Sequence, residues 1–200
     1  MNERSIEYSF VFKSISIASP KKALDVGTGL TALPALIKAC DIDITAIDKD
    51  KSQIQGNLYW KVVCDDIMDS KLNSKFDLVT CISVLEHIKE YNMAIKSMVE
   101  KLNSNGFLIL TFPYNETKYI ANNYDLPNAG YGQGSGILCQ SFSREQIDGW
   151  VKSHNLKIIE QEYWRVFTGD YWTVGSKLNS PSITTKDGLH QLTCVLLQRI

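Results

Sequence analysis

Short apolar, β-branched runs alternate along this chain with longer segments of helical period, and this alternation constrains the fold most strongly. It predicts a parallel sheet covered by helices on both faces, which is an α/β doubly wound domain. No repeat, low-complexity tract or linker divides the sequence, so we expect a single domain over residues 1–200. The expected strands are Ala23–Val26, Ile44–Ile47, Val62–Cys64, Phe76–Ile82, Phe107–Phe112, Lys157–Tyr163 and Leu192–Gln198.

Three segments between these strands have the spacing of amphipathic helices. Thr31–Cys40 is the first, and Pro34 is compatible with it only in the first turn. The second carries apolar residues from Ile88 to Leu102, and Asn105-Gly106 provides a stop. Residues 143–146 (Ser-Arg-Glu-Gln) fit a capping box that opens the third helix.

The segment from Asn115 to Gln140 does not follow this pattern. It has little periodicity, three tyrosines, and a glycine at every second position from Gly130 to Gly136. A structureless stretch of this length in a compact domain is usually functional or disordered. We therefore expect residues 115–140 to form a substrate-side loop or lid. With Tyr114, which directly precedes the segment, its tyrosines either shape an acceptor pocket or pack within the loop; they are Tyr119, Tyr124 and Tyr131.

The charge balance argues against a nucleic-acid partner. Lysine and arginine number 21 against 22 acidic residues, for a formal net charge of −1, whereas nucleic-acid binders usually carry a basic excess. The first ten residues lack the apolar core of a signal peptide, and no stretch approaches the ~18 apolar residues of a membrane span. We therefore expect a cytoplasmic protein with no membrane partner.

The cysteines and aromatic residues give weaker indications. The five cysteines are widely spaced, with no Cys-x-x-Cys pair, and the three histidines stand far apart. This pattern predicts neither disulfides nor a structural zinc site, and we expect no metal. An aromatic cluster beyond the sixth expected strand fits either core packing or a homodimer contact. Its members are Trp164, Phe167, Tyr171 and Trp172.

A glycine-containing turn follows the first expected strand. Gly27 and Gly29 allow the backbone to turn tightly and to approach a ligand at the start of the next helix. With Ala32 they also satisfy the looser dinucleotide fingerprint, so the turn alone fits two classes of cofactor. Asp25, at the end of an apolar strand, distinguishes them. A buried carboxylate needs a cationic or hydrogen-bonding partner, such as the ammonium of an amino acid, and dinucleotide folds prefer an apolar residue near the pyrophosphate.

Acidic residues also follow the second and third expected strands. Asp48 lies about 20 residues beyond the glycines, where a carboxylate accepts hydrogen bonds from two ribose hydroxyls. A solvated helix cap is the structural alternative for it. Asp65 and Asp66 could accept from an adenine amine while Ile67 packs on the ring, although alone they form an ordinary acidic turn. Together these positions complete an adenosine site along the carboxyl ends of adjacent strands.

The stretch from Phe76 to Ile88, FDLVTCISVLEHI, resembles the fourth motif of the class I S-adenosylmethionine-dependent methyltransferases, and in particular methyltransferase type 11-like members. The resemblance includes the three preceding motifs and covers roughly Arg4 to Phe112. It implies a Rossmann-like, mostly parallel seven-stranded sheet with an antiparallel last strand. It also implies S-adenosylmethionine as cofactor and S-adenosylhomocysteine as product. The sequence departs from the family at Thr31, which replaces the third glycine, and in the short interval after Asp48, which predicts a short or frayed helix.

The resemblance assigns cofactor-binding positions residue by residue. The glycine turn matches the methionine side, Asp48 the ribose ligand, and the acidic turn the adenine pocket. The main chain near Ser83 would flank the sulfonium, and the N-terminal segment is similar to one that folds over the cofactor in some relatives. The complete set is Arg4, Tyr8, Asp25, Gly27, Thr28, Gly29, Asp48, Lys49, Asp65, Asp66, Ile67, Cys81, Ile82 and Ser83.

His87 is the best-placed candidate for a general base, which methyl transfer needs only when the nucleophile is a hydroxyl or a protonated amine. The alternative is a histidine at a helix start that bonds to nearby backbone. Apolar helices and a mixed surface point to a small molecule or glycan intermediate as acceptor. Two other functions stay open: an NAD(P)-dependent Rossmann oxidoreductase, against which Asp25 argues, and a non-catalytic S-adenosylmethionine-binding protein.

Overall fold

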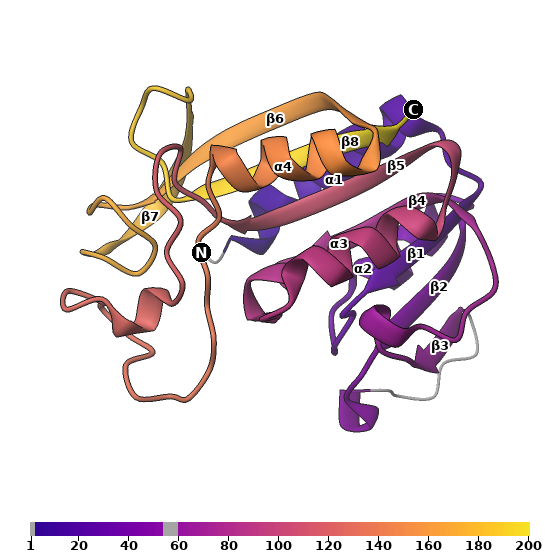
Figure 1. The fold of residues 1–200 in the computed structure, drawn as a ribbon, viewed down its shortest axis with the longest axis horizontal. Helices are drawn as coiled ribbons and strands as arrows, with labels where there is room; N and C mark the ends of the chain where they lie inside the picture. The colour runs from indigo at the N-terminus through magenta and orange to yellow at the C-terminus, as the bar shows by residue number, and fades with distance from the viewer. Residues whose placement is uncertain (1–2, 54–59) are drawn as a thin grey trace.

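The computed structural model describes residues 3–53 and 60–200, which form one mixed sheet of eight strands in the order β3-β2-β1-β4-β5-β8-β6-β7 (Figure 1). Strands β1 to β5 pair in parallel, and β8 runs antiparallel between β5 and β6. The strands are β1 (Lys22–Val26), β2 (Asp43–Asp48), β3 (Lys61–Cys64), β4 (Phe76–Ile82), β5 (Leu102–Pro113), β6 (Leu156–Phe167), β7 (Lys177–Thr184) and β8 (Leu192–Arg199).

Helices cover both faces of this sheet. The α-helices are α1 (Arg4–Ala18), α2 (Leu33–Ala39), α3 (Tyr91–Glu100) and α4 (Arg144–His154), and the short 3₁₀ helices are η1 (Lys51–Gln53), η2 (Ile67–Asp69), η3 (Leu85–His87) and η4 (Asn123–Asp125). Residues of α1 and α2 belong to one core cluster and those of α3 and α4 to another. In Figure 1, α3 and α4 lie in front of the sheet and α1 behind it. Strand side chains alternate between the faces, so Ile109 of β5 joins the first cluster and Leu110 the second.

The predicted α/β fold with an antiparallel last strand is confirmed, because β8, the last strand along the chain, pairs antiparallel with β5. The described residues contain one strand more than the seven expected, because β7 pairs with β6 at the edge of the sheet. No residue of β7 is fully buried, and Pro181 lies within it, so no apolar alternation marks the segment as a strand. An edge strand tolerates proline because one side of its backbone has no partner strand.

The predicted helix signals have mixed outcomes. Pro34 lies in the first turn of α2, as expected, and the capping box at Ser143 is present. The predicted stop at Asn105-Gly106 is wrong, because α3 ends at Glu100 and β5 already begins at Leu102. Asn105 has a left-handed φ of 62°, and that conformation suits an irregularity inside a strand as well as a helix end.

Helix α1 is not marked by the sequence pattern. Its buried residues Ile6, Glu7, Phe10, Val11 and Ser14 have helical spacing, but two of the five are polar, and this weakens the periodic signal. The helix packs against the described strands through the α1–α2 cluster. Its N-terminal end thereby reaches the carboxyl edge of the sheet, where Arg4 Nη1 donates to the carbonyl of Ile82 at 3.3 Å.

The two departures from the family motif lie at this same edge. Thr31 continues the glycine turn, with its amide donating to the carbonyl of Thr28 at 3.2 Å. The short helix expected after Asp48 begins as η1, and the rest of the interval, residues 54–59, lies outside the described residues.

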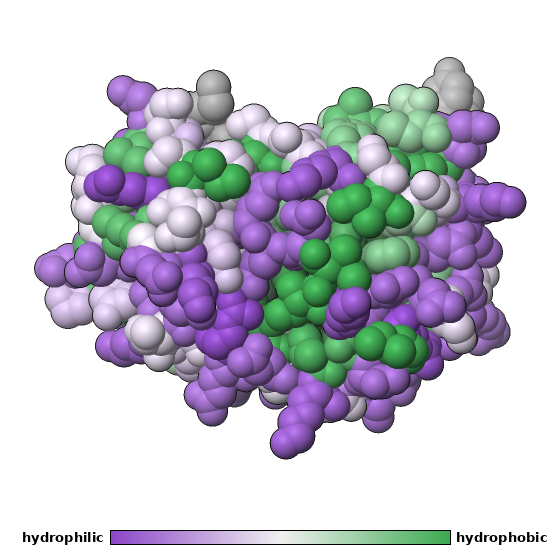
Figure 2. All heavy atoms as spheres, turned by 90° about the horizontal axis from the view of Figure 1, so that it is seen from above, coloured by the Kyte–Doolittle hydropathy of each residue, from purple (hydrophilic) through white to green (hydrophobic). Residues whose placement is uncertain are grey.

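The surface seen from above is hydrophilic along its lower border and has a connected apolar area near its middle (Figure 2). Among the helices that the structure describes, none combines the length and apolar character that a membrane span requires.

Candidate active site

A hollow of about 310 Å³ opens at the carboxyl ends of β1, β2, β3 and β4. Its volume lies within the ~300–1,000 Å³ range of small-molecule pockets. The parallel strands end at a common edge, so residues that are far apart in the sequence meet there. The predicted site residues that line it are Gly27, Gly29, Asp48, Lys49, Asp65, Asp66, Ile67, Ser83 and His87. We call this hollow the strand-end pocket.

A smaller hollow adjoins it, and Val26 and Gly27 line both. Helix α1 brings Arg4 and Tyr8 to this second hollow, where they meet Asp25. The structure thus brings together the N-terminal segment and the first-strand motif, which the resemblance placed in one site. We call this second hollow the α1 pocket; Ile82 also lines it.

Two predicted residues have side chains that face neither hollow. Cys81 is fully buried in the core on the α3–α4 side, and burial raises its thiol pKa well above the usual value. Thr28 is also buried; its amide donates to the carbonyl of Ile47 at 3.0 Å, and its side chain hydrogen-bonds to Asp25. Both side chains are therefore buried inside the protein and do not line either hollow.

The glycine turn depends on a backbone conformation that favours glycine. Gly27 has φ of 70° and Gly29 φ of 51°, both in the left-handed region. A Cβ on Gly27 would lie 2.6 Å from Val84 Cγ1, so the loop after β4 packs directly on this turn. The amide of Gly29 donates to Asp48 Oδ2 at 2.9 Å, and the amide of Asp50 donates to Asp48 Oδ1 at the same distance. Asp48 therefore holds the turn as well as facing the pocket.

Asp25 is 2% exposed, and it has the hydrogen-bonding partner that its position in the sequence required. Thr80 Oγ1 on the neighbouring strand donates to Asp25 Oδ1 at 2.6 Å. Burial raises the pKa of Asp25 to about 6, while its hydrogen bonds and the charge of Arg4 act in the opposite direction. A cation bound in the α1 pocket would favour the ionised form further.

The acidic turn after β3 is already engaged with the protein. Asp65 accepts from Ser70 Oγ at 2.6 Å and from the amide of Lys71 at 3.1 Å. Asp66 caps η2 by accepting from the amide of Met68 at 2.9 Å. Both residues line the strand-end pocket, but their carboxylates also shape the turn that presents Ile67 to it.

His87 faces the strand-end pocket and also bonds to backbone, so both sequence interpretations describe part of its environment. Its Nδ1 lies 2.5 Å from the carbonyl oxygen of Leu138. A carbonyl only accepts, so Nδ1 carries the hydrogen, and Nε2 of the neutral ring is an acceptor. The side chain is 43% exposed.

Glu86 is a buried carboxyl that sequence reasoning missed. It is 4% exposed, and its Oε2 has no hydrogen-bond partner among the described residues. Burial raises the pKa of Glu86 to about 8, and the nearby carboxylate of Glu7 adds to the shift. The sequence contains one hint, because this acidic residue lies between the apolar residues Leu85 and Ile88 of the fourth motif.

The end of the segment 115–140 contacts η3, through Leu138 and Gln140. The amide of Gln140 donates to the carbonyl of Glu86 at 3.0 Å, and its side-chain Nε2 donates to that of Ile88 at 2.9 Å. Tyr119 donates its hydroxyl to Gln140 Oε1, and the ring of Tyr131 packs 6.1 Å from that of Tyr124. In Figure 1 this segment and the loops at the ends of β6 and β7 lie at the same end of the molecule.

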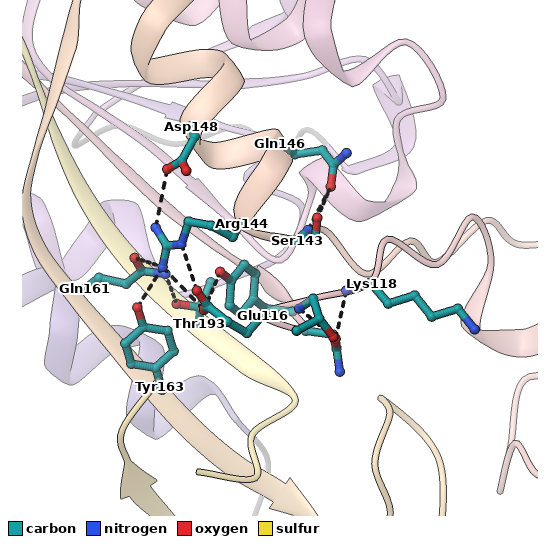
Figure 3. A network of polar contacts seen from close by, with 12 residues as sticks. Glu116, Lys118, Ser143, Arg144, Gln146, Asp148, Gln161, Tyr163 and Thr193 are labelled. Atoms are coloured by element: carbon teal, nitrogen blue, oxygen red, sulfur yellow. Dashed lines mark hydrogen bonds and ion pairs between the residues drawn. The ribbon is translucent and has the colours of Figure 1, made fainter. Parts of the chain in front are cut away.

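Tyr114 and the start of this segment belong to a separate polar network (Figure 3). Arg144 at the start of α4 donates to Glu116 at 3.0 Å and to the hydroxyl of Tyr163 at 2.7 Å. Tyr114 donates to Glu116 at 2.8 Å, and its ring stacks on His190. This network attaches the segment to α4 and β6, so Tyr114 has a packing role.

The aromatic cluster lies at the end of β6 and in the loop that follows it, and it also packs internally, since the rings of Phe167 and Trp172 lie 5.1 Å apart. Both side chains belong to the α1–α2 core cluster. A homodimer contact remains a prediction.

Comparison with known proteins places these features in context. A family model described as "Methyltransferase domain" matches residues 7–161. The mitochondrial ubiquinone biosynthesis O-methyltransferase of Schizosaccharomyces pombe is 30% identical over 125 residues, which are 56% of this chain and 45% of that protein. The ubiquinone biosynthesis O-methyltransferase of Coxiella burnetii strain RSA 493 is 26% identical over 155 residues, 70% of this chain and 65% of that protein. The chain thus spans about half to two thirds of the length of these curated relatives.

Solved structures with the same fold are more distant in sequence. TehB from Haemophilus influenzae aligns with a TM-score of 0.67 at 16% identity, over 96% of this chain and 62% of that one. An S-adenosylmethionine-dependent methyltransferase from Clostridium acetobutylicum aligns with a TM-score of 0.64 at 14% identity, over 100% of this chain and 92% of that one. At these identities the likeness establishes the fold.

Gly27→Ala should destabilise the protein more than Gly134→Ala. Both glycines have φ of 70°, so alanine is strained at either position by roughly 1 kcal/mol. At Gly27 the new Cβ would also collide with Val84, whereas no atom of the described residues lies within 4 Å of one at Gly134. Urea unfolding should show a further loss of about 1–3 kcal/mol for the first variant. Equal losses would contradict the close packing of the two loops.

Glu86→Gln should make stability less dependent on pH. The folded-state pKa of Glu86 is about 8, whereas the unfolded carboxyl ionises near its usual pKa of about 4.3, so the unfolded state loses its proton first as pH rises. Stability of the natural protein therefore falls between about pH 5 and pH 8, by at most about 1.4 kcal/mol per pH unit from this group. Urea unfolding across that range measures the slope. Glu90→Gln, an exposed change at the start of α3, is the control, and the same slope in both variants would contradict the assignment.

Proposed function

Because the chain belongs to the methyltransferase-domain family, we propose that it binds S-adenosylmethionine at the carboxyl edge of the sheet and transfers the methyl group to a small acceptor. The observation that carries this proposal is the pair of adjoining hollows that share Gly27. One has a strand-end carboxylate that suits a ribose, and the other has a guanidinium and a carboxyl that suit the charged groups of an amino acid. A nucleoside joined to an amino acid carries the groups that suit both linings.

The strand-end pocket fits the adenosine part. The apolar walls for a base are Ile47, Ile67 and Met68. Asp48, at the end of β2, and the glycine turn line the same hollow. The Asp48 oxygens already accept from two backbone amides, but each carboxylate oxygen has a second lone pair that can accept from a ribose hydroxyl.

The α1 pocket, about 10 Å³ in this structure, has the charged groups that suit the amino-acid part, which would enter only if the hollow widened. Both hydrogen bonds that Arg4 makes within the described residues use Nη1, so its other N–H groups can meet a carboxylate. Asp25 lies in the same hollow and can accept from an ammonium group, directly or through water. A pyrophosphate would instead meet the Asp25 carboxyl, and this favours the proposal over an NAD(P)-dependent oxidoreductase.

When bound, S-adenosylmethionine supplies a methyl group that is already activated on a sulfonium. The residues of the chain have to align the acceptor with that group and exclude water. We propose that residues 115–140 do both, and the support is that Gln140 ties the end of this segment to the backbone of η3 beside the strand-end pocket. We assign this segment as the cover of the acceptor.

His87 is assigned as the general base for a hydroxyl acceptor. The carbonyl of Leu138 holds the ring through Nδ1, so Nε2 is left to accept a proton, and the side chain lines the pocket. The hydrogen bond also couples the ring to residues 115–140. A bound acceptor that moved this segment would therefore move the histidine with it.

Small-molecule acceptors agree with the names of the relatives. The curated relatives are named as ubiquinone biosynthesis O-methyltransferases, and the structural neighbours include a coclaurine N-methyltransferase solved with N-methylheliamine and a 1,6-didemethyltoxoflavin N1-methyltransferase solved with its acceptor. The net charge of −1 gives no support to a nucleic-acid acceptor. We propose a small molecule or a glycan intermediate.

Asp48→Ala should weaken binding of S-adenosylhomocysteine by about 10- to 100-fold, because a charged hydrogen-bond acceptor for the ribose is lost. Isothermal titration calorimetry measures the affinity. Asp43→Ala, an exposed change at the other end of β2, is the control and should bind as the natural protein does. Undiminished binding by Asp48→Ala would show that the ribose lies elsewhere. Stabilisation by NAD but not by S-adenosylhomocysteine in a thermal shift would overturn the proposed function itself.

His87→Asn should lower methyl transfer to hydroxyl acceptors by roughly 10²- to 10⁴-fold without changing the affinity for S-adenosylhomocysteine. The asparagine amide can still donate to Leu138, but it lacks the proton acceptor of the imidazole. Transfer of a labelled methyl group to a panel of phenols and amines measures the rate. His154→Asn at the end of α4 is the control. Unchanged transfer to every hydroxyl acceptor would exclude His87 as the base.

A further inference from the structure

Glu7 on α1 is a fully buried carboxylate that joins three elements at the carboxyl edge of the sheet. Its Oε1 accepts from Ser83 Oγ at 2.5 Å, where β4 has ended, and from Thr111 Oγ1 on β5 at 2.7 Å. Its Oε2 accepts from Arg4 Nη1 at 2.8 Å. All three contacts lie beside the two hollows of the candidate site, because Arg4 lines one and Ser83 the other.

Stability alone gives a weak reason for a charge at this position. Removing a carboxylate from water costs several kcal/mol, and a buried ion pair often does no better than apolar residues of similar size. The neighbours of Glu7 on the buried face of α1 are apolar, namely Ile6, Phe10 and Val11. An apolar residue would therefore suit the packing of the helix. The charge of Glu7 is therefore better explained by the groups that its carboxylate binds, the guanidinium of Arg4 and the hydroxyls of Ser83 and Thr111.

The first group that Glu7 holds is the guanidinium of Arg4. Its side chain is 34% exposed, and the carbonyl of Ile82 is its other hydrogen-bond acceptor within the described residues. Arg4 also lies close enough to Asp25 for the two charges to interact. Without Glu7, the guanidinium would be left to the other acidic groups whose charges interact with it, Glu86 and the Asp25 carboxyl, and the proposed function reserves Asp25 for the ammonium of the ligand. Glu7 thus holds the arginine through Nη1.

The second group is the turn at Ser83. This residue has φ of 51°, a left-handed conformation that is unfavourable for a side chain other than glycine. Its amide donates to Thr111, to the carbonyl oxygen at 3.1 Å and to Oγ1 at 3.1 Å. Glu7 accepts from the hydroxyls of both residues, so it closes a ring of hydrogen bonds around the strained turn. The main chain that lines the strand-end pocket is held in place by that ring.

We propose that Glu7 is a positioning residue of the cofactor site, which orients Arg4 toward the carboxylate of the methionine part and fixes the main chain at Ser83. The inference rests on the proposed function, because it assumes that the α1 pocket receives the amino-acid part of S-adenosylmethionine. It assigns a role to the one carboxylate that ties α1 to both β4 and β5 among the described residues.

The experiment compares two ligands that differ in the amino-acid part. S-adenosylhomocysteine has the carboxylate, and 5′-methylthioadenosine lacks it, so the ratio of their affinities reports on the α1 pocket. Glu7→Gln retains an oxygen that can accept from Ser83 and Thr111 but loses the charge that holds Arg4. We expect calorimetry to show a loss of about tenfold or more for S-adenosylhomocysteine, with methylthioadenosine changed by less than about twofold.

Two further variants make the result specific. Glu160→Gln removes one of the two ion pairs that Lys13 of α1 makes with β6, the one at 3.2 Å, while the pair with Glu162 remains, and should leave both affinities unchanged. Arg4→Gln should reproduce the selective loss, and adding Glu7→Gln to it should weaken S-adenosylhomocysteine no further, because the two residues act through one contact. If Glu7→Gln does not fold, the affinities of Arg4→Gln for the two ligands still test whether Arg4 binds the amino-acid part.

The possible outcomes separate the two proposals. Equal losses for both ligands in Glu7→Gln, or unchanged binding of S-adenosylhomocysteine in Arg4→Gln, would overturn the role of Glu7 while the proposed function stands. If the natural protein binds neither ligand, the proposed function itself fails. A selective loss in both single variants, absent from Glu160→Gln, supports the positioning role.

Discussion

The hydrogen bond from the Gly29 amide to the Asp48 carboxylate is the contact on which the candidate site depends. It joins the turn after β1 to the end of β2, and it holds that turn in the left-handed conformation that brings Gly27 against Val84. Three strand ends are thereby drawn together, and the strand-end pocket lies between them. The same carboxylate is proposed to accept hydrogen bonds from the ribose. One group would therefore both shape the pocket and bind the ligand.

Buried acids give this edge of the sheet its electrostatic character. Glu7, Asp25 and Glu86 are all at most 4% exposed, and Arg4 is the cation whose charge acts on each of them. Such groups reduce stability, since each carboxyl that stays ionised in the interior has lost its hydration. Natural proteins accept this cost where the charges serve binding or catalysis. The concentration of buried acids at one strand edge fits a site that receives a cationic ligand.

The strand-end positions of the site were predictable because they follow from local patterns. Asp25 lies near the end of the apolar run of β1, Asp48 ends the apolar, β-branched run of β2, and parallel strands bring their carboxyl ends to one edge. The expected end of α3 was wrong for a local reason too, since an Asn-Gly pair permits a left-handed residue in a strand as readily as after a helix. Helix α1 escaped prediction because polar residues interrupt the apolar face that packs on the sheet.

By itself, the sequence determined the α/β architecture, the glycine turn and the acidic residues at the strand ends, because hydrophobic period and turn chemistry act over a few neighbouring residues. Only the tertiary structure decided which distant groups meet. It brought Glu7 to Ser83 and Thr111, set His87 against the carbonyl of Leu138, and buried Glu86 without a partner for one oxygen among the described residues. Those contacts span from 51 to 104 positions in the chain, and their energies depend on burial and charge that no local pattern encodes.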